Sequence, residues 1–282
     1  MKRLYTLYSS KSDSKNLEDR IHSIEQACQT RNIQCISIDQ ELFDFSVKPE
    51  LSQDDAVFNI SRGARVLESF FLNEKVKSIY RHFPREGNDR NTTQLNMVLQ
   101  NSKILLPKTI FYVSNKRSLR ERYVSELNGF PVIVKVTGGS GGLGTMIVNS
   151  FEEYWSLTDY LLSINESFVL KEFISSDSVE RYNIVGNQVF KVYSRQLPST
   201  DFRSDGYART VAIYDCPSEL TEELQAICKA SNLWVAGIDM IKSNKDGNNY
   251  LLEVNCPANF AYIEKVTGEK IYDAIANLLL TF

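Results

Sequence analysis

The chain has 282 residues with a formal net charge of −3, and 43% of them are hydrophobic and 24% charged, as in an ordinary globular protein. The slight acidity argues against a nucleic-acid-binding protein, and no apolar run reaches the roughly 18 residues of a membrane span. The five cysteines do not have metal-site spacing, and no signal-peptide pattern is present, which favours a cytoplasmic protein with free thiols. With only two histidines, Ser-His-Asp chemistry is disfavoured.

The first part of the chain predicts alternating strands and helices. Apolar residues at Leu17, Ile21, Ile24 and Cys28 have helical spacing. Strands are expected at residues 4–8, 34–38 and 56–60, and a second helix at 64–72. This rhythm predicts a small parallel sheet. No glycine-rich fingerprint follows the first strand, so we do not expect this part to bind a nucleotide.

The polar segment 81–92 predicts a domain boundary. Helices are expected beyond it at 91–100, 118–127 and 151–164, with strands at 109–113, 132–136 and 145–148. The last part predicts strands at 168–174, 180–185, 189–195, 210–214, 235–241 and 250–254, with helices at 219–230 and 269–279. The chain is therefore divided into an α/β domain (1–88), a central α+β subdomain (89–166) and a strand-rich C-terminal subdomain (167–282).

The most distinctive stretch runs from residue 130 to residue 144. A β-rich run contains Lys135, and five glycines and one serine follow within residues 138–144. Glycines allow the backbone to turn its N–H groups onto phosphate oxygens, and a preceding lysine adds a positive charge. A Walker loop or a dinucleotide fingerprint would need a helix after the glycines, whereas a second strand is expected here. From the residues alone, a plain flexible hairpin is an equally good interpretation.

Two carboxylates lie within apolar strands of the predicted last hairpin. Glu253 and Asn255 are two residues apart, so they project to the same face of a strand, and Asp239 can join them if the strands pair. Three oxygen ligands of this kind suit Mg²⁺ together with substrate phosphates. A solvent-facing strand edge is the alternative, but acidic residues among apolar ones are seldom buried without a partner.

Taken together, these patterns resemble the ATP-grasp carboxylate–amine ligases, in the branch of glutamate ligases that modify a ribosomal protein or the carrier of lysine biosynthesis. The similarity begins at about Asp89. It is carried by Val-Ile-Val-Lys135 with the glycine loop, Leu-Lys-Glu172-Phe-Ile, Asp-Phe-Arg203-Ser, Ala-Gly-Ile-Asp239, Leu-Glu253-Val-Asn255 and Ile-Glu-Lys265-Val-Thr-Gly. The resemblance implies the ATP-grasp fold: a parallel α/β domain, a central subdomain with a glycine-rich flap, and an antiparallel C-terminal subdomain.

The resemblance also implies roles for individual residues. Phosphate contacts are implied for Lys135 and Arg90, the flap for Gly138, Gly139, Ser140, Gly141, Gly142 and Gly144, and nucleoside contacts for Lys171, Glu172, Phe173, Ile174 and Asp177. The implied magnesium ligands are Asp239, Glu253 and Asn255, for two Mg²⁺ ions, with Mn²⁺ as an alternative. A catalytic role is implied for Arg203, as the substrate-binding arginine, and for Arg181 and Arg195, which align with further family arginines.

The sequence departs from the family where substrate is expected. The usual Asp-Lys pair is Asp89-Arg90, and Arg203-Ser is followed by Asp205 rather than by an asparagine with a small-residue loop. After the implied metal ligand Asn255, residues 256–262 replace the usual small-residue run. These changes leave the ATP chemistry intact and leave glutamate specificity open.

We therefore expect an ATP- and Mg²⁺-dependent enzyme that joins a carboxylate to an amine through an acyl phosphate, releasing ADP and phosphate. Amino acids or peptides are the expected substrates, without nucleic acid or membrane, and a homo-oligomer is left open. One alternative is a ligase that modifies the precursor peptide of a ribosomally made natural product. Another is a non-catalytic ATP-binding protein, since a fold alone does not prove activity.

Overall fold

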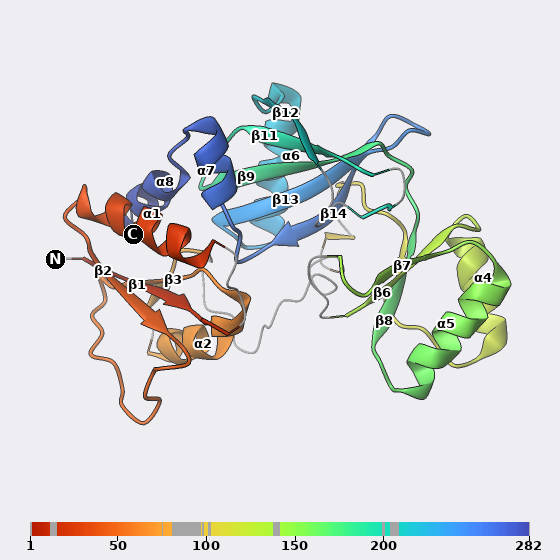
Figure 1. The fold of residues 1–282 in the computed structure, drawn as a ribbon, viewed down its shortest axis with the longest axis horizontal. Helices are drawn as coiled ribbons and strands as arrows, with labels where there is room; N and C mark the ends of the chain where they lie inside the picture. The colour runs from red at the N-terminus through yellow and green to blue at the C-terminus, as the bar shows by residue number, and fades with distance from the viewer. Residues whose placement is uncertain are drawn as a thin grey trace.

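The computed structural model describes residues 2–11, 16–74, 76–80, 97, 99–100, 103–137, 142–198, 201–203 and 209–281. Within these residues the chain forms three β-sheets. Figure 1 shows the N-terminal sheet at one end of the molecule, the C-terminal sheet in the middle and the central sheet at the other end. The expected boundary at 81–92 and most of the expected helix at 91–100 lie outside the described residues.

The N-terminal sheet is parallel, as the alternating pattern predicts. Its strand order is β2-β1-β3-β4, and all three pairings along that order are parallel. Each connection returns the chain to the same end of the sheet: helices make the β1–β2 and β3–β4 connections, and the segment 40–55 makes the β2–β3 connection. The elements are β1 (Arg3–Tyr8), α1 (Leu17–Gln29), β2 (Gln34–Asp39), β3 (Ala56–Asn59), η1 (Arg62–Ala64), α2 (Arg65–Asn73) and β4 (Lys77–Ser78).

The central sheet is antiparallel, with the order β5-β8-β6-β7. β6 and β7 form the expected hairpin around the glycine-rich stretch. β8 also belongs to this sheet, which therefore includes residues beyond 166, and β5 is shorter than the expected strand. The elements are β5 (Thr109–Ile110), α4 (Arg117–Glu126), β6 (Val132–Val136), β7 (Thr145–Val148), α5 (Phe151–Ser163) and β8 (Phe168–Glu172).

The C-terminal sheet is antiparallel, with the order β12-β11-β9-β13-β14 and β10 paired to β9. The expected strand at 189–195 is split, because Phe190 turns into the core and the backbone N–H of Lys191 donates to Glu269 Oε2 at 2.9 Å. The elements are β9 (Ser178–Val185), β10 (Gln188–Val189), β11 (Val192–Gln196), β12 (Arg209–Tyr214), α6 (Ser218–Ala230), β13 (Val235–Lys242), β14 (Asn249–Asn255), α7 (Ala261–Thr267) and α8 (Ile271–Leu280).

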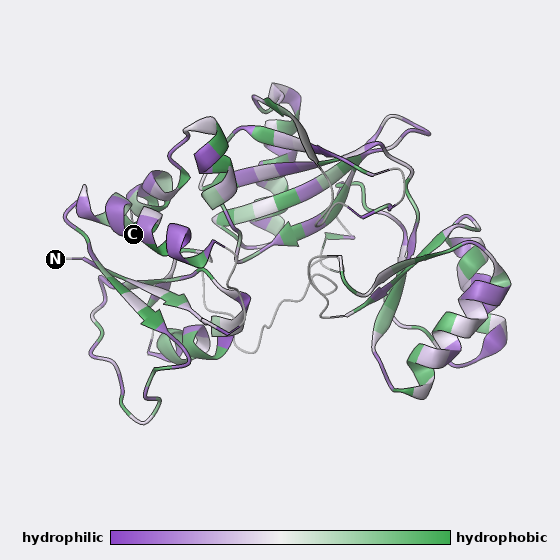
Figure 2. Cartoon of the chain, viewed as in Figure 1, coloured by the Kyte–Doolittle hydropathy of each residue, from purple (hydrophilic) through white to green (hydrophobic). Residues whose placement is uncertain are grey.

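One hydrophobic core joins the N-terminal and C-terminal sheets. Leu4 and Ile24 belong to the same buried cluster as Ile238 and Ile275, and α1 packs against α8. Each buried side chain of this size stabilises the fold by roughly 1.5–3 kcal/mol. The central sheet has its own core, which includes Val134. Figure 2 shows that hydrophilic as well as hydrophobic residues lie along the strands of the C-terminal sheet.

No helix in the described ranges is long and apolar enough to cross a membrane.

Candidate functional site

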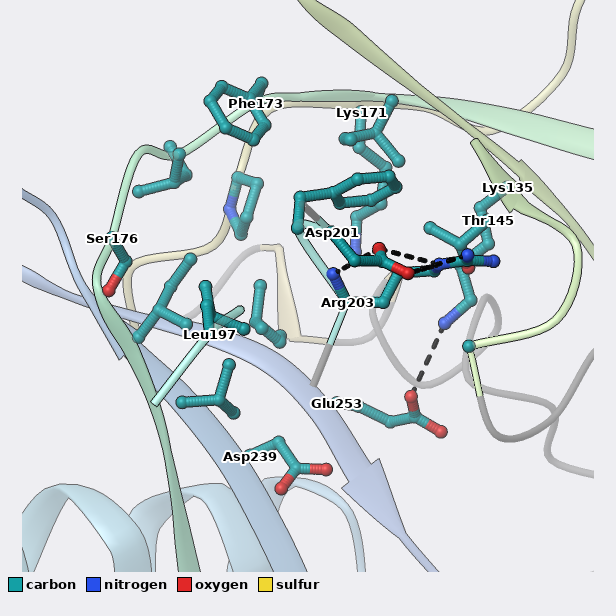
Figure 3. A pocket seen from close by; sticks show the side chains of 18 of the residues that line it. Lys135, Thr145, Lys171, Phe173, Ser176, Leu197, Asp201, Arg203, Asp239 and Glu253 are labelled. Atoms are coloured by element: carbon teal, nitrogen blue, oxygen red, sulfur yellow. Dashed lines mark hydrogen bonds and ion pairs between the residues drawn. The ribbon is translucent and has the colours of Figure 1, made fainter. Parts of the chain in front are cut away.

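A cavity of about 890 Å³ opens between the central and C-terminal sheets. Its walls come from β6, β7, β8, β9, β11, β13 and β14, and from the segments that precede β5 and follow β8 and β11. Among the described residues of the N-terminal part, Arg62 also lines it. In Figure 3 Lys171 and Phe173 lie along one side of this cavity, and Asp239 and Glu253 lie along the other. The cavity therefore brings together blocks that are far apart in the sequence.

Most of the residues implied by the family resemblance gather here. Gly144 lies at the end of the β6–β7 hairpin, and Arg195 reaches the cavity residue Asp239. Arg90, Gly138, Gly139, Ser140 and Gly141 lie outside the described residues. The cavity is lined by Lys135, Gly142, Lys171, Glu172, Phe173, Ile174, Asp177, Arg181, Arg203, Asp239, Glu253 and Asn255.

Two lysines project from neighbouring strands of the central sheet. Lys171 on β8 pairs with Ile133 on β6, two residues before Lys135, so both lysines lie on the same face of the sheet. Lys135 Nζ lies 3.4 Å from Glu253 Oε2, across the cavity (Figure 3). Burial and the nearby charge of Lys135 lower the pKa of Lys171 to about 8, although Glu253 opposes this. This arrangement favours an anionic ligand.

The three oxygen-bearing residues of the last hairpin meet on one face. Asp239 pairs with Glu253, and Gly237 pairs with Asn255, in the antiparallel register of β13 and β14. Directly opposite residues project to the same side, as do residues two apart. Asn255 Nδ2 donates to Asp239 Oδ2 at 3.0 Å, which fixes the direction of the amide. The predicted pairing of these strands is therefore present.

Asp239 is held by two arginines. Arg181 lies opposite Asp239 on β9, and its Nε and Nη2 donate to the two carboxylate oxygens at 2.5 and 2.8 Å. Arg195 Nη2 lies 3.5 Å from Oδ1. Burial raises the pKa of Asp239, and both guanidinium groups oppose that rise. The catalytic role that the resemblance implies for these two arginines stays a prediction, and in the structure both contact Asp239.

Glu253 is an ionised carboxylate among cations. Burial alone would raise its pKa, but Lys135, Arg62 and Arg181 outweigh burial and hold the pKa below the usual range. Lys135 is 3.4 Å away, and Arg62 Nη2 lies 3.7 Å from Oε1. Glu253 is therefore ready to bind a cation at neutral pH.

The donor set fits magnesium. No group of three or more His, Cys, Asp and Glu side chains that could hold a metal occurs in the part of the chain that the structure describes. The proposed set instead uses two carboxylates and the Asn255 amide, which are the hard oxygen donors that Mg²⁺ prefers when phosphates complete its shell. Both oxygens of Asp239 accept from Arg181, Asn255 Oδ1 accepts from Arg62, and Glu253 pairs with Lys135, so a cation lies beside each proposed ligand.

The linker after β8 is fixed by side-chain hydrogen bonds. Glu172 accepts from Asn128 Nδ2 at 2.5 Å and from the backbone N–H of Lys108 at 3.2 Å. Asp177 accepts from Asn244 Nδ2 at 3.0 Å, and its carbonyl accepts from Leu197. The apolar side chains beside this linker can form a slot for a flat base; they are Phe173, Ile174, Leu197, Pro198, Ile241 and Leu252.

Arg203 lines the cavity, but its guanidinium is engaged within its own loop. Nε and Nη2 donate to Asp201, with Nη2 at 2.8 Å from Oδ2, and the backbone N–H of Arg203 also donates to Oδ1 (Figure 3). In this pair, two nitrogens of the Arg203 guanidinium donate to the two oxygens of one carboxylate, which is how an arginine binds a carboxylate in a bidentate way. It also means that a substrate carboxylate would have to replace Asp201.

Sequence reasoning did not identify Arg62 or the apolar residues of the segment after β11. Arg62 follows the carboxyl end of β3, and in parallel α/β sheets ligands bind at that end of the strands. The position of Arg62 after a parallel strand was therefore the signal that could have identified it, because the sequence Ser-Arg-Gly-Ala is not distinctive by itself. Leu197, Pro198 and Phe202 enter the cavity only through the fold of the chain between β11 and β12.

Comparison with known proteins identifies the family. Residues 89–279 match the model of the RimK-like ATP-grasp domain. A probable alpha-L-glutamate ligase of Alkalilimnicola ehrlichii is 30% identical over 222 residues, which cover 77% of this chain and 69% of that protein. The match covers 63% of the length of other curated relatives, such as the probable alpha-L-glutamate ligase 1 of Shewanella oneidensis.

Solved structures agree with the fold over the whole chain. The ATP-grasp ligase PsnB complexed with its minimal precursor has a TM-score of 0.72 at 16% identity, covering 99% of this chain and 98% of that one. The macrocyclase MdnC of Microcystis aeruginosa, bound with the precursor peptide MdnA, has a TM-score of 0.71 at 18% identity and covers 100% of both chains. The expected ATP-grasp fold is thus confirmed, and the chain belongs to the RimK-like ATP-grasp family of ATP-dependent ligases.

Proposed function

We propose that this protein joins the carboxylate of an amino acid or peptide to an amine, through an acyl phosphate, with release of ADP and phosphate. The observation that carries the proposal is the cavity in which Lys135 and Lys171 face the oxygen donors Glu253 and Asn255. Cations opposite a magnesium-type donor set suit a nucleoside triphosphate, and family membership supplies the reaction class.

In this proposal the nucleotide lies along the wall made by β6, β8 and the linker after β8. The base enters the apolar slot beside Phe173 and Leu197, and Lys135 and Lys171 bind phosphate oxygens. Glu253 and Asn255, with Asp239, would hold Mg²⁺, which supplies neutralisation of phosphate charge. Solved structures of PsnB with Mg and ADP are compatible with this assignment. Arg90 and the remaining flap residues stay predictions of the sequence.

The chemistry needs binding and charge neutralisation rather than a protein nucleophile. A carboxylate oxygen of the acid forms a bond to the γ-phosphorus while the bond to the ADP oxygen breaks. The amine nitrogen then forms a bond to the acyl carbon, phosphate leaves, and the amine proton passes to solvent. Cationic side chains such as Lys135 and Arg203 stabilise charge on the transferring group. The glycine-rich hairpin would exclude water, because water would hydrolyse the acyl phosphate.

The substrates are proposed from the relatives. Their name, probable alpha-L-glutamate ligase, makes L-glutamate the first acid and amine to test. PsnB and MdnC bind precursor peptides, and both resemble this chain over nearly its full length. A peptide acid or peptide acceptor is therefore the second candidate, tested with peptides that contain Glu, Asp and Lys side chains.

A screen for ADP release tests the proposal. We expect ADP with free phosphate when the correct acid and amine are combined with ATP and Mg²⁺. Lys135→Ala should abolish this release, whereas Lys116→Ala, which removes an exposed lysine of the central subdomain, should keep wild-type rates. Circular dichroism should show both variants folded. Release of AMP and pyrophosphate, or full activity of Lys135→Ala, would contradict the proposal.

A further inference from the structure

Arg62 reaches the cavity from the N-terminal domain. It is the first residue of η1, three positions after the last residue of β3, and lines the cavity that the other two sheets enclose. Its Nη2 donates to Asn255 Oδ1 at 2.8 Å and lies 3.7 Å from Glu253 Oε1. One guanidinium group therefore contacts two of the three proposed metal ligands.

The loop that carries Arg62 is fixed by hydrogen bonds of buried side chains. Asn59 is buried; its Oδ1 accepts from the backbone N–H of Ser61 at 2.9 Å, and its Nδ2 donates to Glu68 Oε2 at 2.9 Å. Ser61 is buried as well, and its hydroxyl accepts from the backbone N–H of Gly63 at 3.3 Å. The backbone on both sides of Arg62 is thus held in place.

Gln40 adds a further support from the segment that follows β2. Its Nε2 donates to the carbonyl of Gly63 at 2.8 Å, and its Oε1 accepts from the backbone N–H of Leu67 at 2.9 Å. Functional side chains need such a supporting layer, because precise positioning depends on the groups behind them. A surface salt bridge gains little free energy and would not need this support.

Arg62 and a metal ion compete for the same oxygens. Asn255 cannot turn its amide away without losing the hydrogen bond from Nδ2 to Asp239 Oδ2. An arginine remains positively charged under all ordinary conditions, so it cannot share Asn255 Oδ1 and Glu253 Oε1 with Mg²⁺ without repulsion. When the metal site is filled, the Arg62 guanidinium must lie elsewhere, and its fixed backbone keeps it beside the cavity.

We propose that Arg62 is a substrate-binding residue, which exchanges Asn255 and Glu253 for the carboxylate of the acid substrate when the metal–nucleotide complex binds. This inference rests on the proposed function. The two oxygens of a carboxylate match the fork of a guanidinium, and the reacting carboxylate must lie next to the phosphate that the metal holds. The Arg203 guanidinium already binds both carboxylate oxygens of Asp201. Arg62, in contrast, loses Asn255 and Glu253 when the metal binds, and can then bind the carboxylate of the acid.

The first test measures metal binding without turnover. Electron paramagnetic resonance of Mn²⁺ in the presence of ADP compares wild type, Arg62→Gln and a control, Lys48→Gln. Lys48 is an exposed cation of the same domain that pairs with Glu74 at 3.0 Å. We expect Arg62→Gln to bind Mn²⁺ several-fold more tightly, because a competing cation is gone, and the control to match wild type. Equal or weaker Mn²⁺ binding by Arg62→Gln would show that Arg62 does not compete with the metal for Asn255 and Glu253, and would overturn the proposal.

The second test measures the acid. With the acid found in the ADP-release screen, Arg62→Gln should raise its KM by roughly tenfold to a hundredfold, as expected for loss of a charge-assisted contact, and should change the KM of ATP much less. Arg62→Lys should restore part of the loss. An unchanged KM for the acid would overturn the role of Arg62. If wild type releases no ADP with any acid, the proposed function fails, and the Mn²⁺ measurement still decides the exchange.

Discussion

At the scale of single residues, the site is defined by the cations that surround the two carboxylates Asp239 and Glu253. In the described part of the cavity, Asp239 and Glu253 face several positively charged side chains, and Lys171 is only 7% exposed. Such crowding costs stability in the empty protein and is offset when a polyanion binds. The cations concerned are Lys135, Lys171, Arg62, Arg181 and Arg195.

The buried Lys171 should make the free energy of unfolding depend on pH. Its pKa is about 8 in the folded protein, against about 10.4 for an unfolded lysine. Below pH 8 its buried charge therefore destabilises the fold, by about 3 kcal/mol from the size of the shift, and the cost disappears as pH rises toward 10. Lys171→Met should be more stable than wild type at pH 7, with the difference shrinking toward pH 10.

Urea unfolding of both proteins between pH 7 and pH 10 measures that difference. The other titratable groups are the same in the two proteins, so their contributions to the pH dependence cancel. A gap that stays constant with pH would contradict a lowered pKa of Lys171. The same variant should bind ATP more weakly than wild type, since the position then offers no charge to phosphate.

Gly237 matters because of what lies beside it. A Cβ atom at this position would be 2.5 Å from Arg181 Nη1 and 3.3 Å from the Cβ of Ala258. Gly237→Ala should push Arg181 off Asp239, and a displacement of this kind in an active site can lower kcat by on the order of a hundredfold. Steady-state kinetics and thermal unfolding check this: a folded variant with wild-type kcat would show that the Arg181–Asp239 pair is not needed.

At the scale of elements, the β6–β7 hairpin couples the glycine-rich stretch to Lys135. Gly144 has a φ of +77°, its carbonyl accepts from the backbone N–H of Val136 at 2.8 Å, and a Cβ there would lie 3.1 Å from Val136 Cβ. A side chain would therefore disturb the hairpin directly after Lys135.

Gly144→Ala is expected to weaken nucleotide binding, and Gly247→Ala is its matched control. Gly247 has a similar φ of +72° with nothing within 4 Å of its Cβ position, in the β13–β14 turn. Both variants should lose about 1–2 kcal/mol of stability from the left-handed backbone, and only Gly144→Ala should show a raised Kd for nucleotide by calorimetry. Equal Kd values in the two variants would show that the β6–β7 hairpin does not contribute to nucleotide binding.

Elements with a strong local pattern could be predicted from the sequence. Helix α1 and strands β1, β6 and β7 agree closely with expectation, because apolar periodicity reports burial on one face. Helix α7 was not expected: it has seven residues and ends at Gly268, so it offers too few turns for a period to show.

Contacts between distant segments were the part that sequence could not supply. Pairing of Asp239 with Glu253 was predicted, since the two strands are neighbours in the chain. The fork of Arg181 on Asp239 and the reach of Arg62 to Asn255 join residues 58 and 193 positions apart. No local pattern encodes such contacts, because they depend on the order of strands in a sheet and on how the domains pack.

At the scale of the whole molecule, the described residues form three hydrophobic clusters, and two of them set the geometry of the site. The N-terminal and C-terminal sheets share one core, so Arg62 is fixed relative to Glu253 and Asn255. The central sheet, which carries Lys135 and Lys171, packs around a separate core. A nucleotide between the two would touch both units, so its binding should link their positions.

The measurement that tests the central claim most directly follows an oxygen atom. The acid substrate is labelled with ¹⁸O in its carboxylate, and the products of one reaction with ATP and the amine are analysed by mass spectrometry. An acyl phosphate transfers one labelled oxygen to inorganic phosphate and leaves ADP unlabelled. Label in AMP would mean adenylation of the acid, and unlabelled phosphate would mean hydrolysis without activation; either result would contradict the account.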